Sequence, residues 1–142
     1  MQEDNVDRLL KARAEIDEEL RRHKVPLTIL FTDVVGSTAY FDRFGDTAGL
    51  AMLQRHAVLA SNTVVEFGGR VIKTIGDSVM AEFPEPACAV RAAQQIQRRI
   101  TKLNEEPCTC GCNQTLARCR VDDPKCPVSL PRAKELVAAI VH

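Results

Sequence analysis

The sequence predicts an α+β fold, a ferredoxin-like split βαβ palm with helices on one face of the sheet and a further helix at the N-terminus. Strand-like and helix-like patterns alternate in the order β-α-α-β-β-α between residues 27 and 103. The last two strands are short and joined by a tight Gly-Asp turn. A split βαβ unit requires this order. With 142 residues, 45% of them apolar, the chain suffices for one modest domain with short appendages.

Residues 1–24 are expected to form one charged helix that ends before Pro26. Arg13 occupies one position of an otherwise apolar heptad pattern. The apolar members of this pattern are Val6, Leu9, Ile16 and Leu20. Two interpretations stay open, a short parallel coiled coil and a helix surrounded by solvent.

Residues 27–35 form an apolar, β-rich run that predicts a buried strand. Gly36 ends this run, and Ser37 or Thr38 is expected to cap the helix that follows. One or two helical turns are predicted over 40–44.

A longer helix is predicted over 48–66, and the Gly68-Gly69 pair ends it. The side chains expected on its inner face are Leu50, Leu53, Ala57, Leu59, Val64 and Val65. Strands at 70–74 and 78–83 then form a hairpin, and a third helix covers 87–103. Its expected inner face consists of Val90, Ala93, Ile96 and Ile100.

From residue 107 onward the sequence loses its periodicity and becomes rich in cysteine. The chain therefore divides into a helical linker (1–24), a partial catalytic-type domain (25–106) and a loop-like tail (107–142) that closes with a short helix over about 131–141. Cys88 stands alone. The five clustered cysteines are Cys108, Cys110, Cys112, Cys119 and Cys126. They favour a metal site, for Zn²⁺ or an iron–sulfur cluster, over redox or disulfide chemistry or unligated thiols. This would be a second metal site beside the one proposed below for two aspartates.

The overall charge excludes some functions. Nineteen basic and nineteen acidic side chains cancel, so no net field favours nucleic acid or an anionic membrane. No apolar run reaches the ~20 residues that span a bilayer. The N-terminus is too charged for a secretory signal, and we expect a cytoplasmic protein.

Two aspartates carry the chemistry. Asp33 follows the first strand and Asp77 lies in the hairpin turn. Because the first strand lies beside the hairpin in a split βαβ sheet, both carboxylates are expected to meet at one edge. There they would hold Mg²⁺ or Mn²⁺ with a triphosphate, and the amides of residues 36–38 would receive phosphate oxygens. Taken singly, each residue also has a plain structural role, as a turn, a cap or a surface lysine in the case of Lys73.

Two motifs combine these residues, LTILFTDVVGSTAYFDRFGD and GGRVIKTIGDSVMAEFPEPACAVRAAQQIQRRI. They resemble the N-terminal half of a class III adenylate/guanylate cyclase catalytic domain, over residues 27–103. The resemblance implies a head-to-tail dimer with its active sites at the interface. It also implies two divalent ions per site and conversion of ATP or GTP to the 3′,5′-cyclic nucleotide and pyrophosphate.

The resemblance also assigns roles to single residues. Asp33 and Asp77 match the two metal-binding aspartates, and Val34 matches the position whose carbonyl also touches a metal. Gly36, Ser37 and Thr38 match the turn that holds phosphate. Lys73 matches the lysine that recognises the purine and indicates ATP rather than GTP.

The chain departs from the family pattern after residue 103. The strand with an R-x-G-x-H-x-G pattern, and the Asn and Arg that orient ribose and phosphate, have no counterpart in the sequence. We therefore expect weak or no activity of this chain alone, and activity in a homodimer or a heterodimer with a complete cyclase. The alternative is a non-catalytic module that pairs with a complete cyclase and senses metal or redox state through its cysteines. A GGDEF-type or polymerase palm also pairs two aspartates, but the TDVVGST string favours cyclases.

Overall fold

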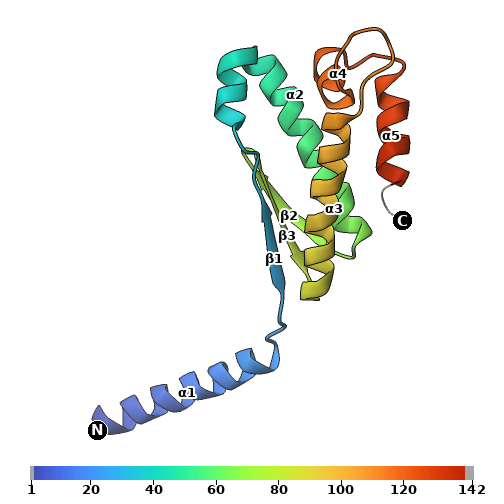
Figure 1. Cartoon of the computed structure of the whole chain (residues 1–142). Helices are drawn as coiled ribbons and strands as arrows, with labels where there is room; N and C mark the ends of the chain where they lie inside the picture. The colour runs from blue at the N-terminus through green and yellow to red at the C-terminus, as the bar shows by residue number, and fades with distance from the viewer. Residues whose placement is uncertain (1, 140–142) are drawn as a thin grey trace.

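The computed structural model describes residues 2–139 and has an α+β architecture (Figure 1). Three antiparallel strands form one sheet in the order β1-β3-β2. The strands are β1 (Thr28–Thr32), β2 (Arg70–Ile75) and β3 (Ser78–Phe83). The helices are α1 (Gln2–Arg22), α2 (Ser37–Glu66), α3 (Pro86–Glu105), α4 (Leu116–Asp122) and α5 (Ser129–Ala139). The predicted pairing of the first strand with the hairpin is confirmed.

The main core lies between one face of the sheet and the helices α2 and α3 (Figure 1). Alternate residues of β3 point into it, because successive side chains of a strand face opposite sides. These are Val79, Ala81 and Phe83, all at most 1% exposed. Val64 of α2 belongs to one cluster with Ala81 and Phe83. Ile96 of α3 belongs to a second cluster with Val79. The opposite face of the sheet carries no helix within residues 2–139.

The prediction of a buried first strand is wrong. β1 spans only Thr28–Thr32 and lies at an edge, with alternating exposure. Ile29 and Phe31 point to the open face and are 43% and 61% exposed. A continuous apolar run is typical of a strand covered on both sides, but here helices cover one side only.

The two helices predicted after the first strand form one element, α2, with a kink at Gly45 (φ 83°, ψ 169°). The predicted cap is wrong, because Gly36 is the N-cap residue and no side chain caps the helix. Some inner-face predictions also fail: Leu50, Val65 and Val90 are more than half exposed. The predicted inner-face residue Val64 is buried, and so are residues not predicted for the inner face: Gly49, Ala60, Thr63, Ala89 and Ala92.

The tail after residue 107 is more ordered than predicted. Thr115 caps α4, because its hydroxyl oxygen accepts a hydrogen bond from the backbone N–H of Arg118 at 3.3 Å. α4 and α5 enclose a second small core around Leu116, which is fully buried among three cysteines. The final helix begins at Ser129, slightly before the predicted start, and residues 140 and 141 of that prediction lie outside the described part of the chain.

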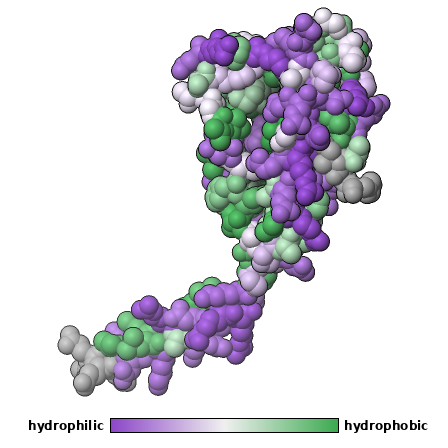
Figure 2. Space-filling model, in the orientation of Figure 1, coloured by the Kyte–Doolittle hydropathy of each residue, from purple (hydrophilic) through white to green (hydrophobic). Residues whose placement is uncertain are grey.

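The predicted N-terminal helix is confirmed as α1, which projects away from the body (Figure 1). Its heptad residues are exposed, and Figure 2 shows apolar patches among the hydrophilic side chains of this helix. A larger apolar area lies over the strands of the sheet (Figure 2). Among residues 2–139, no helix has both the length and the apolar character needed to cross a bilayer.

Candidate functional site

Two carboxylates predicted to meet do lie together at one end of the sheet. Asp33 directly follows β1, and Asp77 lies in the turn between β2 and β3. The pairing of Thr32 with Val79 places these two positions at the same end. Ser37, at the start of α2, donates a hydrogen bond from its hydroxyl to Oδ2 of Asp77 at 2.6 Å. Asp33 and Ser37, which are neighbours in the sequence, therefore meet Asp77 from the distant hairpin turn.

The environment of Asp77 favours its ionised form. The hydroxyl of Ser37 holds the pKa of the Asp77 carboxyl below its usual range, since a donated hydrogen bond stabilises the carboxylate. The side chain of Asp33 also contributes to the lowered pKa of Asp77. Two neighbouring carboxylates repel each other unless a proton or a cation lies between them. Carboxylate oxygens are the ligands that Mg²⁺ and Mn²⁺ prefer, so this donor set fits such an ion.

The turn before α2 holds the remaining predicted residues. Gly36 has a φ of 75°, the left-handed region that glycine adopts without strain. The amide of Ser37 donates to the carbonyl of Val34 at 3.2 Å, so that amide is already engaged. The Val34 carbonyl keeps a second lone pair for another partner. Thr38 is exposed in the first turn of α2, where backbone N–H groups have no helical partner.

Lys73 lies on the open face of the sheet because β2 contains a bulge. Val71 pairs with Ala81 on the helix-covered face, and Lys73 pairs with Met80 after a register shift between residues 71 and 73. Regular pairing would have placed Lys73 opposite Val79, on the covered face. The extra residue of the bulge therefore turns Lys73 to the side away from α2 and α3.

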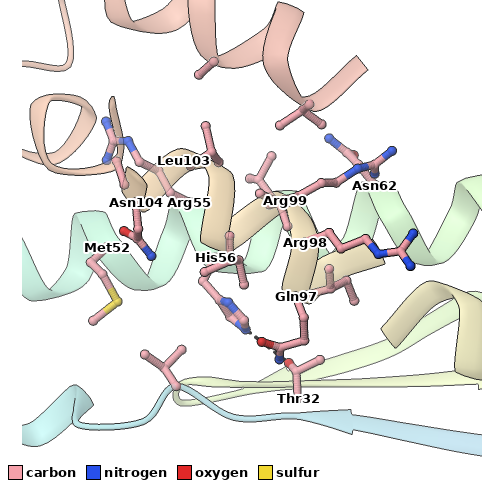
Figure 3. A pocket seen from close by; sticks show the side chains of 18 of the residues that line it. Thr32, Met52, Arg55, His56, Asn62, Gln97, Arg98, Arg99, Leu103 and Asn104 are labelled. Atoms are coloured by element: carbon pink, nitrogen blue, oxygen red, sulfur yellow. Dashed lines mark hydrogen bonds between the residues drawn. The ribbon is translucent and has the colours of Figure 1, made fainter. Parts of the chain in front are cut away.

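One pair of residues at this site was not predicted. His56 of α2 shares a hydrogen bond of 3.2 Å with the hydroxyl of Thr32 (Figure 3). The same hydroxyl accepts from the amide of Val79 at 3.1 Å. Burial lowers the pKa of His56, while the charges of Asp77 and Asp33 raise it in part. The only sequence signal was a polar Thr within an apolar strand directly before Asp33, and nothing local linked it to His56.

The comparisons with known proteins agree with this geometry. No protein-family model matches the chain. A receptor-type adenylate cyclase of Trypanosoma brucei brucei is 30% identical over 97 residues, which cover 68% of this chain and 8% of that protein. An adenylate cyclase of Anabaena cylindrica is 32% identical over 82 residues, or 56% of this chain and 16% of that protein. The chain carries part of a class III cyclase catalytic domain. It spans less than a fifth of the length of either relative.

The solved structures confirm the fold. A bacterial light-regulated adenylyl cyclase superposes with a TM-score of 0.52 and 18% identity, over 73% of this chain and 38% of that one. The prediction of a partial cyclase domain with an α+β fold is therefore confirmed.

A cleft of about 1700 Å³ adjoins Asp33 in the cyclase domain. It lies between the end of β1 and the helices α2 to α5, and Asp33 and Ser37 line one end. Figure 3 labels further lining residues from β1, α2 and α3, which are Thr32, Met52, Arg55, His56, Asn62, Gln97, Arg98, Arg99, Leu103 and Asn104. Arg55 and Arg120 both line the cleft, and burial, followed by repulsion from Arg120, lowers the pKa of Arg55.

The five clustered cysteines lie away from the sheet, in the unit formed by α4, α5 and the loop before α4 (Figure 1). All five clustered thiols are reduced and none forms a disulfide. Four of them lie within 4.8 Å of one another, and Cys112, which neighbours Cys110, is not among these four. The predicted five-cysteine cluster therefore contains four mutually close thiols and a fifth, Cys112, which follows Cys110 in the same exposed loop.

Proposed function

We propose that the chain supplies the metal- and nucleotide-binding side of an adenylate cyclase site, which converts ATP to 3′,5′-cyclic AMP and pyrophosphate. The convergence of Asp33, Asp77 and Ser37 at one end of the sheet supports this proposal most strongly. The adenylate cyclases that the chain resembles agree with it.

Each residue would have a defined task. Asp33, Asp77 and the carbonyl of Val34 would hold two Mg²⁺ or Mn²⁺ ions. When bound, these ions lower the pKa of the attacking 3′-hydroxyl and stabilise the leaving phosphates. Ser37 fixes the orientation of the Asp77 carboxylate through its hydrogen bond. The exposed amides at the start of α2 favour phosphate oxygens, because the N-terminus of a helix carries partial positive charge.

The open face of the sheet would take the purine and a partner subunit. Lys73 lies on this face, where its ammonium group can donate to an acceptor atom of adenine. The exposed apolar side chains Ile29 and Phe31 share the face and favour contact with another protein surface. After α3 the described chain continues into α4 and α5, so we propose that a second subunit provides the groups that stabilise transition-state charge.

Binding of ATP tests the metal site directly. Isothermal titration calorimetry of the full chain with ATP, in the presence and absence of Mn²⁺, should show Mn²⁺-dependent binding. The Asp77→Ala variant should lose it, because one of two ion-holding carboxylates is gone. Asp42→Ala, an exposed carboxylate on α2, is the matched control and should bind as the unchanged protein does. Retained binding in Asp77→Ala would sink the site assignment.

Cyclic-nucleotide production tests the composite site. The purified chain is assayed with Mn²⁺ and ATP or GTP, alone and mixed with a class III cyclase whose own metal aspartates are replaced. Activity only in the mixture, and with ATP above GTP, supports the half-site proposal. Activity of the chain alone would mean that residues 104–142 or a second copy complete the site.

A second candidate function is regulatory pairing without catalysis. The observation that favours it is the cysteine-rich unit of α4 and α5, which packs directly on the cyclase domain through α3. In this case the chain, divided as proposed into 1–24, 25–106 and 107–142, would change the activity of a complete cyclase. A chain carrying both Asp33→Ala and Asp77→Ala should then still produce that change, whereas a half-site donor would not.

A further inference from the structure

Four cysteine sulfur atoms come together between α3, α4 and α5. They belong to Cys108, Cys110, Cys119 and Cys126, and all lie within 4.8 Å of one another. The sulfurs of Cys110 and Cys119 are 4.0 Å apart. Zinc–sulfur bonds of about 2.3 Å place the thiolates of a tetrahedral site about 3.8 Å apart. The four sulfurs therefore need to move inward by less than about 1 Å to surround one ion.

We propose that Cys108, Cys110, Cys119 and Cys126 bind one Zn²⁺ ion in a closed, structural four-thiolate site. Three of these side chains are buried and Cys110 is exposed. With four protein ligands no coordination position is left for water or substrate, which is the hallmark of structural rather than catalytic zinc.

Other uses of these thiols fit less well. A disulfide needs sulfurs about 2.05 Å apart, and one bond would leave the other two thiols unused in the core. An iron–sulfur cluster places several iron and sulfide atoms between its cysteines, so its thiolates must lie farther apart than around a single ion. The mutual approach within 4.8 Å favours the single ion.

The backbone around the sulfurs is already arranged as a metal loop. The amide of Cys108 donates to the carbonyl of Gln114 at 2.8 Å, which closes the loop that carries the first two ligands. Cys119 lies within α4, and Cys126 follows that helix. The amide of Ser129 donates to the sulfur of Cys126 at 3.4 Å, an outer-shell contact of the kind that orients a ligand atom.

The ion would hold α4 in contact with the cyclase domain. Arg118 precedes the ligand Cys119 and donates from Nη1 to the hydroxyl of Tyr40 at 2.7 Å. Its guanidinium also lies 3.9 Å from the ring centroid of Phe44. Both aromatic residues belong to the part of α2 that follows the turn at Gly36. Zinc would thus support the same helix on which the proposed nucleotide site depends.

Metal content and thiol reactivity of the full chain test the proposal. Protein purified under reducing, anaerobic conditions should contain one Zn²⁺ per chain by mass spectrometry. Exchange with Co²⁺ should produce the intense visible absorption of a tetrahedral thiolate complex. In the folded protein only Cys88 and Cys112 should react with a thiol reagent, and all six cysteines should react after chelation under denaturing conditions.

Two serine variants make the assignment specific, because Cys110 and Cys112 are both exposed in one loop and only the first belongs to the group of four. Loss of even an outer-shell partner weakens metal binding by about 10–100-fold, so Cys110→Ser should weaken Zn²⁺ binding by on the order of 100-fold or more. Cys112→Ser should bind as the unchanged protein does. Equal loss in both variants, iron–sulfur absorption bands, or metal-free protein with all thiols reactive while folded would overturn the proposal.

Discussion

At the scale of single residues, a buried positive charge lies between α2 and α3. Arg99 is buried, with 3% of its side chain exposed, and a buried charge is unfavourable unless it is paired. Its guanidinium pairs with Glu66 at 2.8 Å and donates to the hydroxyl of Thr63 at 2.7 Å. Both partners come from α2, so this one side chain links the last turns of α2 to α3.

Replacing Glu66 by glutamine should therefore destabilise the fold. The buried guanidinium would lose its counter-charge but keep Thr63, and we expect a decrease in the free energy of unfolding of about 1–3 kcal/mol. Urea unfolding followed by circular dichroism measures it. Glu105→Gln is the control, because Glu105 forms an exposed pair with Lys102 at 3.7 Å and should change stability by less than about 0.5 kcal/mol. Equal effects in the two variants would contradict this account of Arg99.

At the scale of elements, α4 docks on the first half of α2 through one arginine. Arg118 is held by Asp122 at 2.8 Å, contacts the hydroxyl of Tyr40 and lies over the ring of Phe44. A guanidinium over an aromatic face is attracted by the negative charge of the ring face. This contact joins segments 78 residues apart in sequence.

A double-mutant cycle should detect that link. Arg118→Ala and Phe44→Ala should show a coupling energy of about 0.5–1 kcal/mol in unfolding experiments, because both remove the same partly buried contact. The cycle of Arg43→Ala with Phe44→Ala is the control. Arg43 lies over the same ring at the longer distance of 5.1 Å and on the exposed surface. If the coupling energy of Arg43 with Phe44 is as large as that of Arg118 with Phe44, the arginine of α4 contributes no specific link to α2.

Local sequence patterns predicted the helices and strands better than they predicted how these elements are buried. The Gly76-Asp77 pair between two β-rich runs was sufficient for the hairpin, because a two-residue turn depends on its own residues. The burial of β1 depends on what covers the second face of the sheet, and no pattern within residues 27–35 contains that information. α4 was missed because its seven residues are too few to show a helical period.

In the candidate site, too, some features follow from local sequence and others only from tertiary packing. Asp33 and Asp77 were placed at strand ends by local sequence, and their approach followed from the strand order. Ser37 was expected to cap α2, yet its hydroxyl turns to a carboxylate 40 residues away. The partnership of His56 with Thr32 and the selection of four cysteines out of five depend on tertiary packing, which single-sequence patterns do not encode.

At the scale of the whole molecule, two small cores are joined side by side, and one face of the sheet is left open. One core lies between the sheet and the helices α2 and α3, and the other lies around the buried cysteines. The open face carries exposed apolar side chains from β1 together with Lys73. Burying such a face against a second subunit is favourable by about 25 cal/mol per Å² of apolar surface, so the open face is where we expect subunits to meet.

Phe31→Glu should weaken that association. A carboxylate in the middle of the face would have to lose water on contact, so the self-association constant should fall by at least about tenfold in sedimentation experiments. Val90→Glu is the control, because Val90 is similarly exposed, at 56%, but lies on α3 away from the open face. A purely monomeric parent protein, or an equal effect of both changes, would contradict the expectation.

The bulge in β2 has a consequence beyond the placement of Lys73. β2 and β1 are the two edges of the described sheet, and an edge strand offers unpaired amides and carbonyls on which other chains can build. The bulge interrupts the regular spacing of these groups along β2, so that edge is a poor template for a further strand. β1 pairs with β3 without a register shift and keeps a regular outer edge. Growth of this sheet, whether in a native assembly or in aggregation, is therefore directed to the β1 side.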